Sequence, residues 1–432
     1  MRKSVLALSI ASALSLVAAD RAQAAGFALY EQGISGLGNA YAGAAATAED
    51  ATTVWWNPAG MSRLPKGKHV AFGAAAIQPS WKFSNNGSTA ATGRTLGGEG
   101  GDAGDTAFVP SAFFAMDFGD RWNFGVGVSV PFGLKTEYDP TWLGRFQGIK
   151  SEVQTVNINP AVSYKVSDAL SVGFGINYQQ GKIDILTAVN LGAAGEGQNQ
   201  INLDGDAWGF NIGALFNVTP ATRVGVHYRS SLDYKLDGNT EFFGVPPALA
   251  AGVPQLQNGN IKFDLETPDN LAVSVAHRLN DQLELLGDVT WWHWSKIKSI
   301  PVVRTDGPIA GSALSTLNFN FDDSYRVSIG ANYKLSAPWL LKFGFAYDQT
   351  PVPNAESRTV RLPDSDRYWF SAGAKYLMSK AGALDFGYTY IQASDADINN
   401  RQQNPPAQNN GNVVGTYKAH VHVLGVQYQH SF

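Results

Sequence analysis

Most of the chain beyond residue 68 alternates between apolar and polar or small residues with a period of two. In 170–178, apolar side chains occupy the even positions, and Ser, Gly or Asn the odd ones. The stretches 122–130 and 155–165 repeat the pattern. Successive side chains of a strand point to opposite faces, so the pattern predicts strands with one face in an apolar medium and the other against something polar.

Fourteen such strands are predicted, and their connections alternate between short turns and long loops. The strands are expected near 68–83, 106–118, 122–131, 153–166, 169–183, 204–217, 222–236, 259–279, 282–296, 322–335, 339–349, 366–378, 382–394 and 415–432. Long loops are expected at 84–105, 132–152, 184–203, 237–258, 297–321, 350–365 and 395–414. A β-sandwich has no reason to sort its connections in this way, whereas an outer-membrane barrel has tight periplasmic turns and larger external loops. The sequence therefore predicts an all-β, 14-stranded antiparallel transmembrane β-barrel at 68–432.

The segment 25–67, called the N-terminal segment below, does not alternate. It is dense in Gly and Ala, and each Gly inside a helix costs about 1 kcal/mol relative to Ala, so a long self-standing helix is not expected. Asn57-Pro58 then breaks the chain. We expect this segment to form a small helical hatch that plugs the lumen of the barrel.

Residues 1–24 have the features of a secretory signal peptide. Arg2 and Lys3 precede an apolar run, and Ala22-Gln23-Ala24 is a small-x-small cleavage site. No other stretch offers the about 20 consecutive apolar residues that a transmembrane helix needs. The expected domains are thus 1–24, 25–67 and 68–432.

Composition and charge exclude several classes of protein function. Charged residues make up 16% of the chain, aromatic residues 12%, and Gly numbers 46, which suits a lipid-facing barrel better than a soluble enzyme. The net charge of −4 and the absence of Cys argue against a nucleic-acid partner and against thiolate chemistry. His420 and His422 lack a third metal ligand, and no Ser and His stand in a catalytic spacing. We expect no catalytic residues, no metal and no cofactor.

The expected loop 132–152 carries an unusual apolar load. Its large apolar side chains are Phe132, Leu134, Trp142, Leu143 and Phe146. Such a patch fits either packing within the loop or a landing site for a hydrophobic ligand, and the sequence leaves both open.

Arg367 and Ser371 share one face of their strand, opposite the apolar face, so both are predicted to point into the lumen. A guanidinium there can bind a fatty-acid carboxylate with two parallel hydrogen bonds. The alternative partner is a fixed carboxylate of the protein, such as Asp364, Asp366 or Glu31.

Several stretches resemble the FadL/TodX family of outer-membrane transporters of long-chain fatty acids and hydrophobic compounds. They are AGFALYEQGISGLGNAYAG (25–43), EDATTVWWNPAG (49–60) with its Asn57-Pro58-Ala59, PFGLKTEYDPTWLGRFQ (131–147) and PDSDRYW (363–369). The resemblance covers the whole mature chain. It implies a monomeric barrel with an N-terminal hatch in the outer membrane of a Gram-negative bacterium.

The resemblance also implies a route for passive uptake. Ligand would land among the external loops, reach a lumenal pocket touched by the start of the hatch at Phe27, and leave into outer-membrane lipid through a distorted third strand. In this chain that strand carries Gly125, Gly127 and Pro131, and Pro and Gly both weaken strand pairing. Long-chain fatty acids are the expected ligand. Aromatic hydrocarbons are the alternative within the family, and an outer-membrane lipid hydrolase the alternative outside it.

Overall fold

The structure is a closed barrel of 14 antiparallel strands. This computed structural model describes residues 26–403 and 409–432, so the predicted signal peptide lies outside the described residues. Six of the spanning strands are interrupted and carry two labels each. The strand segments are β1 (Lys68–Asn85), β2 (Ala107–Phe118), β3 (Trp122–Ser129), β4 (Gly133–Glu137), β5 (Lys150–Lys165), β6 (Leu170–Asn190), β7 (Glu196–Thr219), β8 (Thr222–Arg229), β9 (Asp233–Phe243), β10 (Gly259–Glu266), β11 (Asn270–Arg278), β12 (Leu283–Trp292), β13 (Ser299–Arg304), β14 (Ala313–Asn318), β15 (Ser324–Lys334), β16 (Trp339–Asp348), β17 (Arg367–Leu377), β18 (Gly382–Ala393), β19 (Ala396–Gln403) and β20 (Asn409–Ser431).

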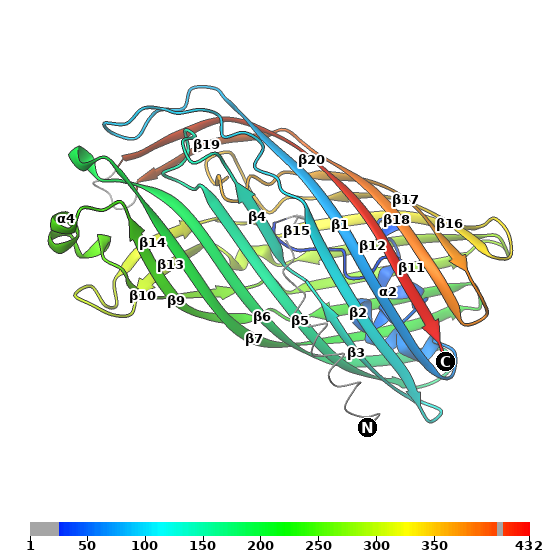
Figure 1. The fold of residues 1–432 in the computed structure, drawn as a ribbon. Helices are drawn as coiled ribbons and strands as arrows, with labels where there is room; N and C mark the ends of the chain where they lie inside the picture. The colour runs from blue at the N-terminus through cyan, green and yellow to red at the C-terminus, as the bar shows by residue number, and fades with distance from the viewer. Residues whose placement is uncertain (1–25, 404–408) are drawn as a thin grey trace.

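The last strand closes the barrel on the first. β20 pairs with β1 from His69↔Ser431 to Asn85↔Gly415. Figure 1 shows the C-terminus at the end of the barrel that carries the short turns, and the helix α4 (Pro247–Gly252) at the opposite, loop-bearing end. The predicted fold class is confirmed.

The period-two pattern sorts side chains between lipid and lumen. On β6, Val172, Phe174 and Ile176 are exposed on the outer surface, whereas Ser171 and Asn177, which flank this run, are buried inside. Unpaired backbone groups are costly in lipid, so a closed ladder of strands is the only way for such a sequence to cross a membrane. No helix among the described residues is long and apolar enough to do so.

The strands extend further on the loop side than the sequence predicted. β6 continues to Asn190 and β7 begins at Glu196, so the expected loop 184–203 is mostly a two-stranded hairpin. The prediction located only the lipid-facing part, because beyond the membrane both faces of a strand can be polar and the alternation fades.

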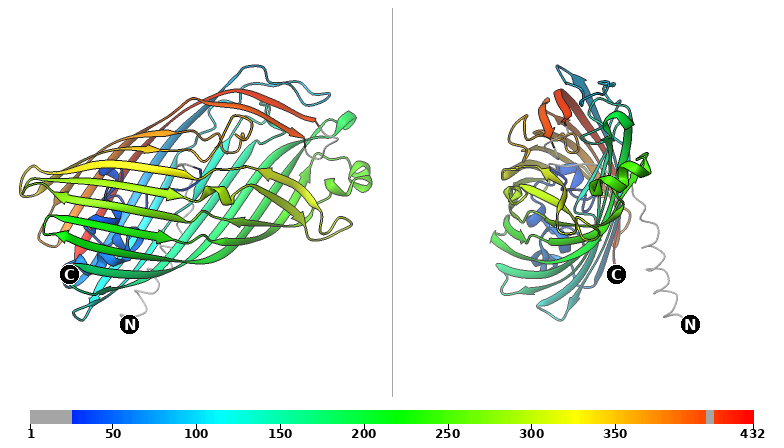
Figure 2. Two further views of the ribbon diagram at one scale, coloured as in Figure 1. Left: turned by 180° about the vertical axis from the view of Figure 1, so that it is seen from behind. Right: turned by 90° about the vertical axis from the view of Figure 1, so that its left-hand side faces the viewer.

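The described part of the N-terminal segment lies inside the barrel as short helical turns. These are η1 (Leu37–Asn39), α2 (Ala44–Thr47), α3 (Thr53–Trp56) and η2 (Pro58–Arg63). The end-on view in Figure 2 shows this blue stretch enclosed by the strands. It lies in the part of the barrel nearer the short turns (Figure 1).

Asn57-Pro58-Ala59 docks one of these turns on the wall. The Asn57 side-chain oxygen accepts a hydrogen bond from Ala59 N at 3.1 Å, and its amide donates to Ala45 O at 2.8 Å and to Ala214 O at 3.0 Å. Gly213 of the barrel wall lies opposite Asn57. Glycine is needed there because a Cβ at this position would collide with the Asn57 side chain.

Charged side chains hold the segment on the opposite wall. Glu49 accepts from Lys342 at 2.7 Å and from Lys375 at 3.0 Å, and Lys342 also donates to Ser35 O at 2.6 Å. Asp385 lies 3.3 Å from Lys342 and completes the group. Buried charges are tolerable when they are paired in this way.

The wall is interrupted between β3 and β4. The ladder between β2 and β3 ends at Ala112↔Val128, so residues 107–111 of β2 pair only with β1. Residues 130–132 leave the sheet and bind the N-terminal segment instead: Leu29 N donates to Pro131 O at 2.8 Å, and Ala28 bridges to Phe132.

Of the three residues expected at a wall defect, only Pro131 lies in this break. Gly125 and Gly127 are paired with both β2 and β5. They leave room for inward side chains instead, because a Cβ at Gly125 would meet Val54 and Met61, and one at Gly127 would meet Phe113.

Candidate functional site

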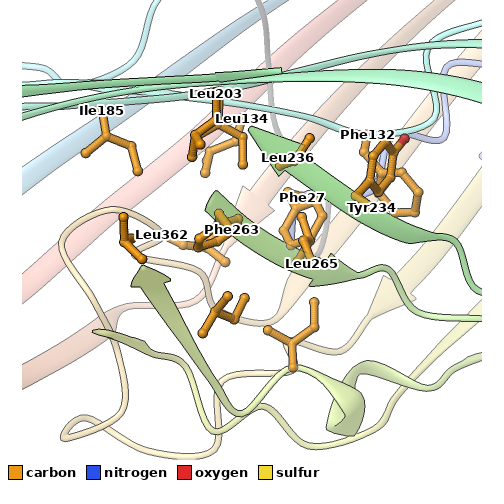
Figure 3. Close-up of a cluster of buried hydrophobic side chains, with 14 of the residues drawn as sticks. Phe27, Phe132, Leu134, Ile185, Leu203, Tyr234, Leu236, Phe263, Leu265 and Leu362 are labelled. Atoms are coloured by element: carbon orange, nitrogen blue, oxygen red, sulfur yellow. The ribbon is translucent and has the colours of Figure 1, made fainter. Parts of the chain in front are cut away.

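Phe27, near the start of the described chain, lies at the centre of a buried apolar cluster in the lumen. Its ring contacts Trp294 edge-on, with centroids 4.9 Å apart, and Phe132 at 5.5 Å. Tyr234, Leu236 and Leu265 surround it (Figure 3). We call this the lumenal cluster. Its other buried members are Ala28, Leu134, Ile183, Ile185, Ile201, Leu203, Ala207, Leu232, Ile261, Phe263, Ile297, Ile300, Val302, Phe321, Val352 and Leu362.

The cluster forms where the inward face of the barrel changes character. Along β6, the inward residues are small or polar from Ser171 to Gln179, where they face the N-terminal segment, and become apolar at Ile183 and Ile185. Ile201 and Leu203 match them on β7. The lumen therefore has a polar lower part filled by the N-terminal segment and an apolar upper part.

A cavity of about 1130 Å³ lies on the loop side of the cluster. Ile185, Ile201 and Val302 belong to both the cavity wall and the lumenal cluster, so the two are continuous. Phe146, Ala188, Leu314 and Leu317 add apolar wall, and Asn190, Asn199 and Arg361 add polar groups. We call this space the outer cavity.

A second, smaller cavity lies below the cluster beside the break in the wall. Its volume is about 50 Å³, and Leu29, Tyr30, Pro131, Phe132 and Trp292 are among its lining residues. Phe132 also belongs to the lumenal cluster and so separates the two spaces.

The structure brings three of the predicted ligand-binding residues together and separates others. Phe27, Phe132 and Leu134 meet in the lumenal cluster. Trp142 and Leu143 instead belong to a separate buried cluster, in which the loop residue Tyr138 and the strand residues Phe83 and Tyr417 also lie. The rings of Trp142 and Tyr138 stack 3.9 Å apart, and Trp142 Nε1 donates to Gly148 O at 2.8 Å.

Phe146 lies apart from Trp142 and Leu143. It is a buried side chain that lines the outer cavity, and the Arg145 guanidinium lies 4.6 Å from its ring. The landing site for a hydrophobic ligand stays a prediction, for which Phe146 is the loop residue that lies at the cavity.

Arg367 and Ser371 point into the lumen, as predicted, but each has a partner in the protein. Arg367 forms a buried ion pair with Asp364. The Ser371 hydroxyl lies 2.7 Å from that of Thr389. Of the two partners considered for Arg367, the structure contains the fixed carboxylate.

Among residues 26–403 and 409–432, no carboxylate lies within ion-pair distance of Arg361. Its guanidinium donates to Ser151 Oγ at 2.9 Å and to Thr187 Oγ1 at 2.7 Å, and its Nε has no hydrogen-bond partner. Burial lowers the pKa of Arg361 to about 10, which leaves it charged at neutral pH. Arg361 belongs to the expected loop 350–365, to which the strand pattern assigns no inward or outward face, and for that reason it was not predicted.

Trp294 also belongs to the site and was not predicted. It is fully buried against Phe27, and its ring stacks 6.0 Å from that of Trp292. Trp292 points into the lumen, where its Nε1 donates to Tyr30 Oη at 2.8 Å, and the two-residue step of a strand points to the same side for Trp294. Within the described residues, no group of three or more His, Asp or Glu could hold a metal ion.

Comparison with known proteins agrees with this architecture. Residues 15–432 match the model of a family described as outer membrane protein transport protein (OMPP1/FadL/TodX). The long-chain fatty acid transport protein of Escherichia coli K12 is 29% identical over 399 residues, covering 84% of this chain and 85% of the relative. Outer membrane protein P1 of Haemophilus influenzae is 29% identical over 397 residues, covering 82% and 83%.

Solved structures show the same fold. A Pseudomonas aeruginosa FadL homologue superposes with a TM-score of 0.88 at 23% identity, covering 94% of this chain and 100% of that one. The Ralstonia pickettii toluene transporter TbuX gives a TM-score of 0.67 at 20% identity, with 94% and 100% covered. Because the family model spans nearly the whole chain, this protein belongs to the OMPP1/FadL/TodX family of outer-membrane transport proteins.

Proposed function

We propose that this protein is a passive channel through which long-chain fatty acids cross the outer membrane. The observation that carries the proposal is the continuity between the outer cavity and the lumenal cluster. The outer cavity shares Ile185, Ile201 and Val302 with the lumenal cluster, and the cluster reaches Phe132 at the break in the wall. Apolar surface of this kind favours contact with an acyl chain over contact with water.

The N-terminal segment is the hatch of this channel. It fills the polar lower lumen, docked through Asn57 and tied through Glu49 to β16 and β17. A ligand at Phe27 would contact the first described residues of the segment directly.

The exit is lateral, between β2 and the break at Val130, Pro131 and Phe132. Residues 107–111 of β2 pair on one side only, and the small cavity ends at Pro131. A ligand that leaves here enters outer-membrane lipid directly, and a single barrel provides the whole route.

Fatty acids are favoured over aromatic hydrocarbons for two reasons. The matched relatives with about 29–30% identity include several named long-chain fatty acid transport proteins. The volume of the outer cavity, about 1130 Å³, is also above the roughly 300–1,000 Å³ typical of small-molecule pockets, far more than one aromatic ring needs.

Uptake of labelled oleate and labelled toluene should be compared in a Gram-negative host that lacks its own transporters for both. Expression of this protein should raise oleate uptake and leave toluene uptake near background. The reverse result would favour the aromatic-hydrocarbon function. Release of free acid from an ester or phospholipid by the purified protein would favour the hydrolase instead.

A further inference from the structure

We propose that Arg361 binds the carboxylate of the fatty acid in the outer cavity, so that the acyl chain enters the lumen tail first. This rests on the proposed function and deepens it, because it assigns the headgroup site and the orientation of the ligand.

The position of Arg361 combines burial, charge and access to the cavity. The side chain is 8% exposed and lines the outer cavity. Its hydrogen bonds go to neutral oxygens, those of the Ser151 and Thr187 side chains and the backbone oxygen of Lys150 at 3.4 Å, and no carboxylate in the described part of the chain lies within ion-pair distance. A buried guanidinium without an anion is costly, and a carboxylate from the ligand would remove that cost.

The other buried arginines of the loop region are paired with a carboxylate or lie away from the outer cavity. Arg367 is paired with Asp364, Arg145 donates to Glu196 at 2.7 Å, and Arg304 lies 3.6 Å from Asp306. Arg358 donates to the backbone oxygens of Asp364 and Asp397, but it does not line the outer cavity. Arg401 also lines the outer cavity, but its side chain is exposed to solvent. Arg361 is therefore the buried cation of the cavity wall that is left to bind an anion.

The apolar residues beside Arg361 favour the binding of an amphiphile over that of a small anion. Phe146, Ile185 and Ala188 line the same cavity, so the wall beside the cation is apolar. Leu362, the next residue, belongs to the lumenal cluster and lies across it from Phe132 in Figure 3. A ligand with its head at Arg361 would place its tail against this cluster, which leads toward Phe27.

The test compares oleate with oleyl alcohol, which has the same chain and no charge. Affinities are measured by displacement of a fluorescent fatty acid from purified wild type, Arg361→Gln and Arg361→Lys. Arg361→Gln should weaken oleate binding about ten-fold, or about 1.4 kcal/mol, and leave oleyl alcohol unchanged. The oleate affinity of Arg361→Lys should lie between those of wild type and Arg361→Gln, because lysine keeps the charge but lacks the planar guanidinium that binds a carboxylate with two hydrogen bonds.

Arg145→Gln is the matched control. It removes a buried guanidinium from the same region, but one that is already paired with Glu196 and does not line the cavity. It should change the two affinities alike. Heat-modifiable migration in gels confirms that each variant is folded.

Equal losses for both ligands in Arg361→Gln, or no loss for oleate, would overturn the headgroup assignment and leave the proposed function standing. If Arg361→Gln does not fold, the affinities of the wild-type protein for oleate and for methyl oleate are compared instead. Oleate must bind more tightly than its methyl ester, and equal affinities would overturn the assignment. Wild type that binds neither oleate nor oleyl alcohol would instead overturn the proposed function.

Discussion

The backbone N–H of Gly26 donates a hydrogen bond of 2.9 Å to Oδ2 of Asp364. The same oxygen accepts from Thr350 Oγ1 at 2.7 Å, and the other carboxylate oxygen pairs with Arg367. One fully buried carboxylate therefore joins the start of the described chain, the segment 349–366 and strand β17. The segment 349–366 and the N-terminal segment are thus linked through one carboxylate.

Removal of either member of the Arg367–Asp364 pair should be strongly destabilising. Asp364→Ala and Arg367→Ala each leave a buried charge unpaired, so each should lower the free energy of unfolding by about 3–5 kcal/mol. The double variant should lose less unfolding free energy than the sum of the two single losses, because the two charges disappear together. Urea unfolding in phospholipid vesicles measures all three.

The same pair distinguishes a structural arginine from a ligand-binding one. Arg367→Ala should weaken the binding of oleate and of oleyl alcohol to the same extent, because the carboxylate partner of Arg367 is fixed in the protein. A loss confined to oleate would mean that the ligand displaces Asp364, and would assign the headgroup to Arg367 instead of Arg361.

Gly213→Ala should loosen the N-terminal segment. The added methyl group would collide with Asn57, which donates to Ala45 O and Ala214 O. We expect a loss of about 1–3 kcal/mol in stability and faster proteolysis within 45–60. Gly287→Ala on β12 is the control, since its new Cβ would meet only Val275 Cγ1, at 3.2 Å, and Ser328 O, at 4.0 Å. Equal protease resistance in both variants would contradict the docking role of Gly213.

Deletion of residues 27–60 should raise single-channel conductance in planar bilayers. The described part of the segment fills the lower lumen, and its loss would leave an aqueous path lined by residues such as Ser171 and Asn177. Retained heat-modifiable migration would show that the barrel itself survives. Unchanged conductance in a folded variant would rule out the hatch role.

The sequence predicted the barrel well because lipid imposes one simple rule on it. Every outward residue must be apolar, so Val172, Phe174 and Ile176 mark the strand without any knowledge of its neighbours. The loop side follows no such rule. Ile185 and Ile201 point into a lumen that only the folded hairpin of β6 and β7 creates, and the prediction treated both as loop.

Charge pairing was the second limit of the sequence. The two-residue alternation along the strand correctly predicted that Arg367 points into the lumen. The alternation does not say which carboxylate lies within ion-pair distance of Arg367. Asp364 reaches it through the path of the segment 349–366, and the same path carries Arg361 to the cavity wall. A one-dimensional pattern cannot rank two arginines that differ only in their partners.

The last prediction concerns the exit. A fatty acid with a photoreactive diazirine at its methyl end, bound and then irradiated, should label peptides that contain 107–111 and 129–132. The reason is that β2 pairs on one side only along 107–111, while Pro131 lacks an N–H, and Val130 O and Pro131 O accept hydrogen bonds from the N-terminal segment rather than from β2. Mass spectrometry locates the labels, and excess oleate should suppress them, which separates channel labelling from background labelling by free lipid. Oleate-sensitive labels confined to 45–64 would instead indicate passage straight through the N-terminal segment toward the periplasm, and the lateral exit would have to be abandoned.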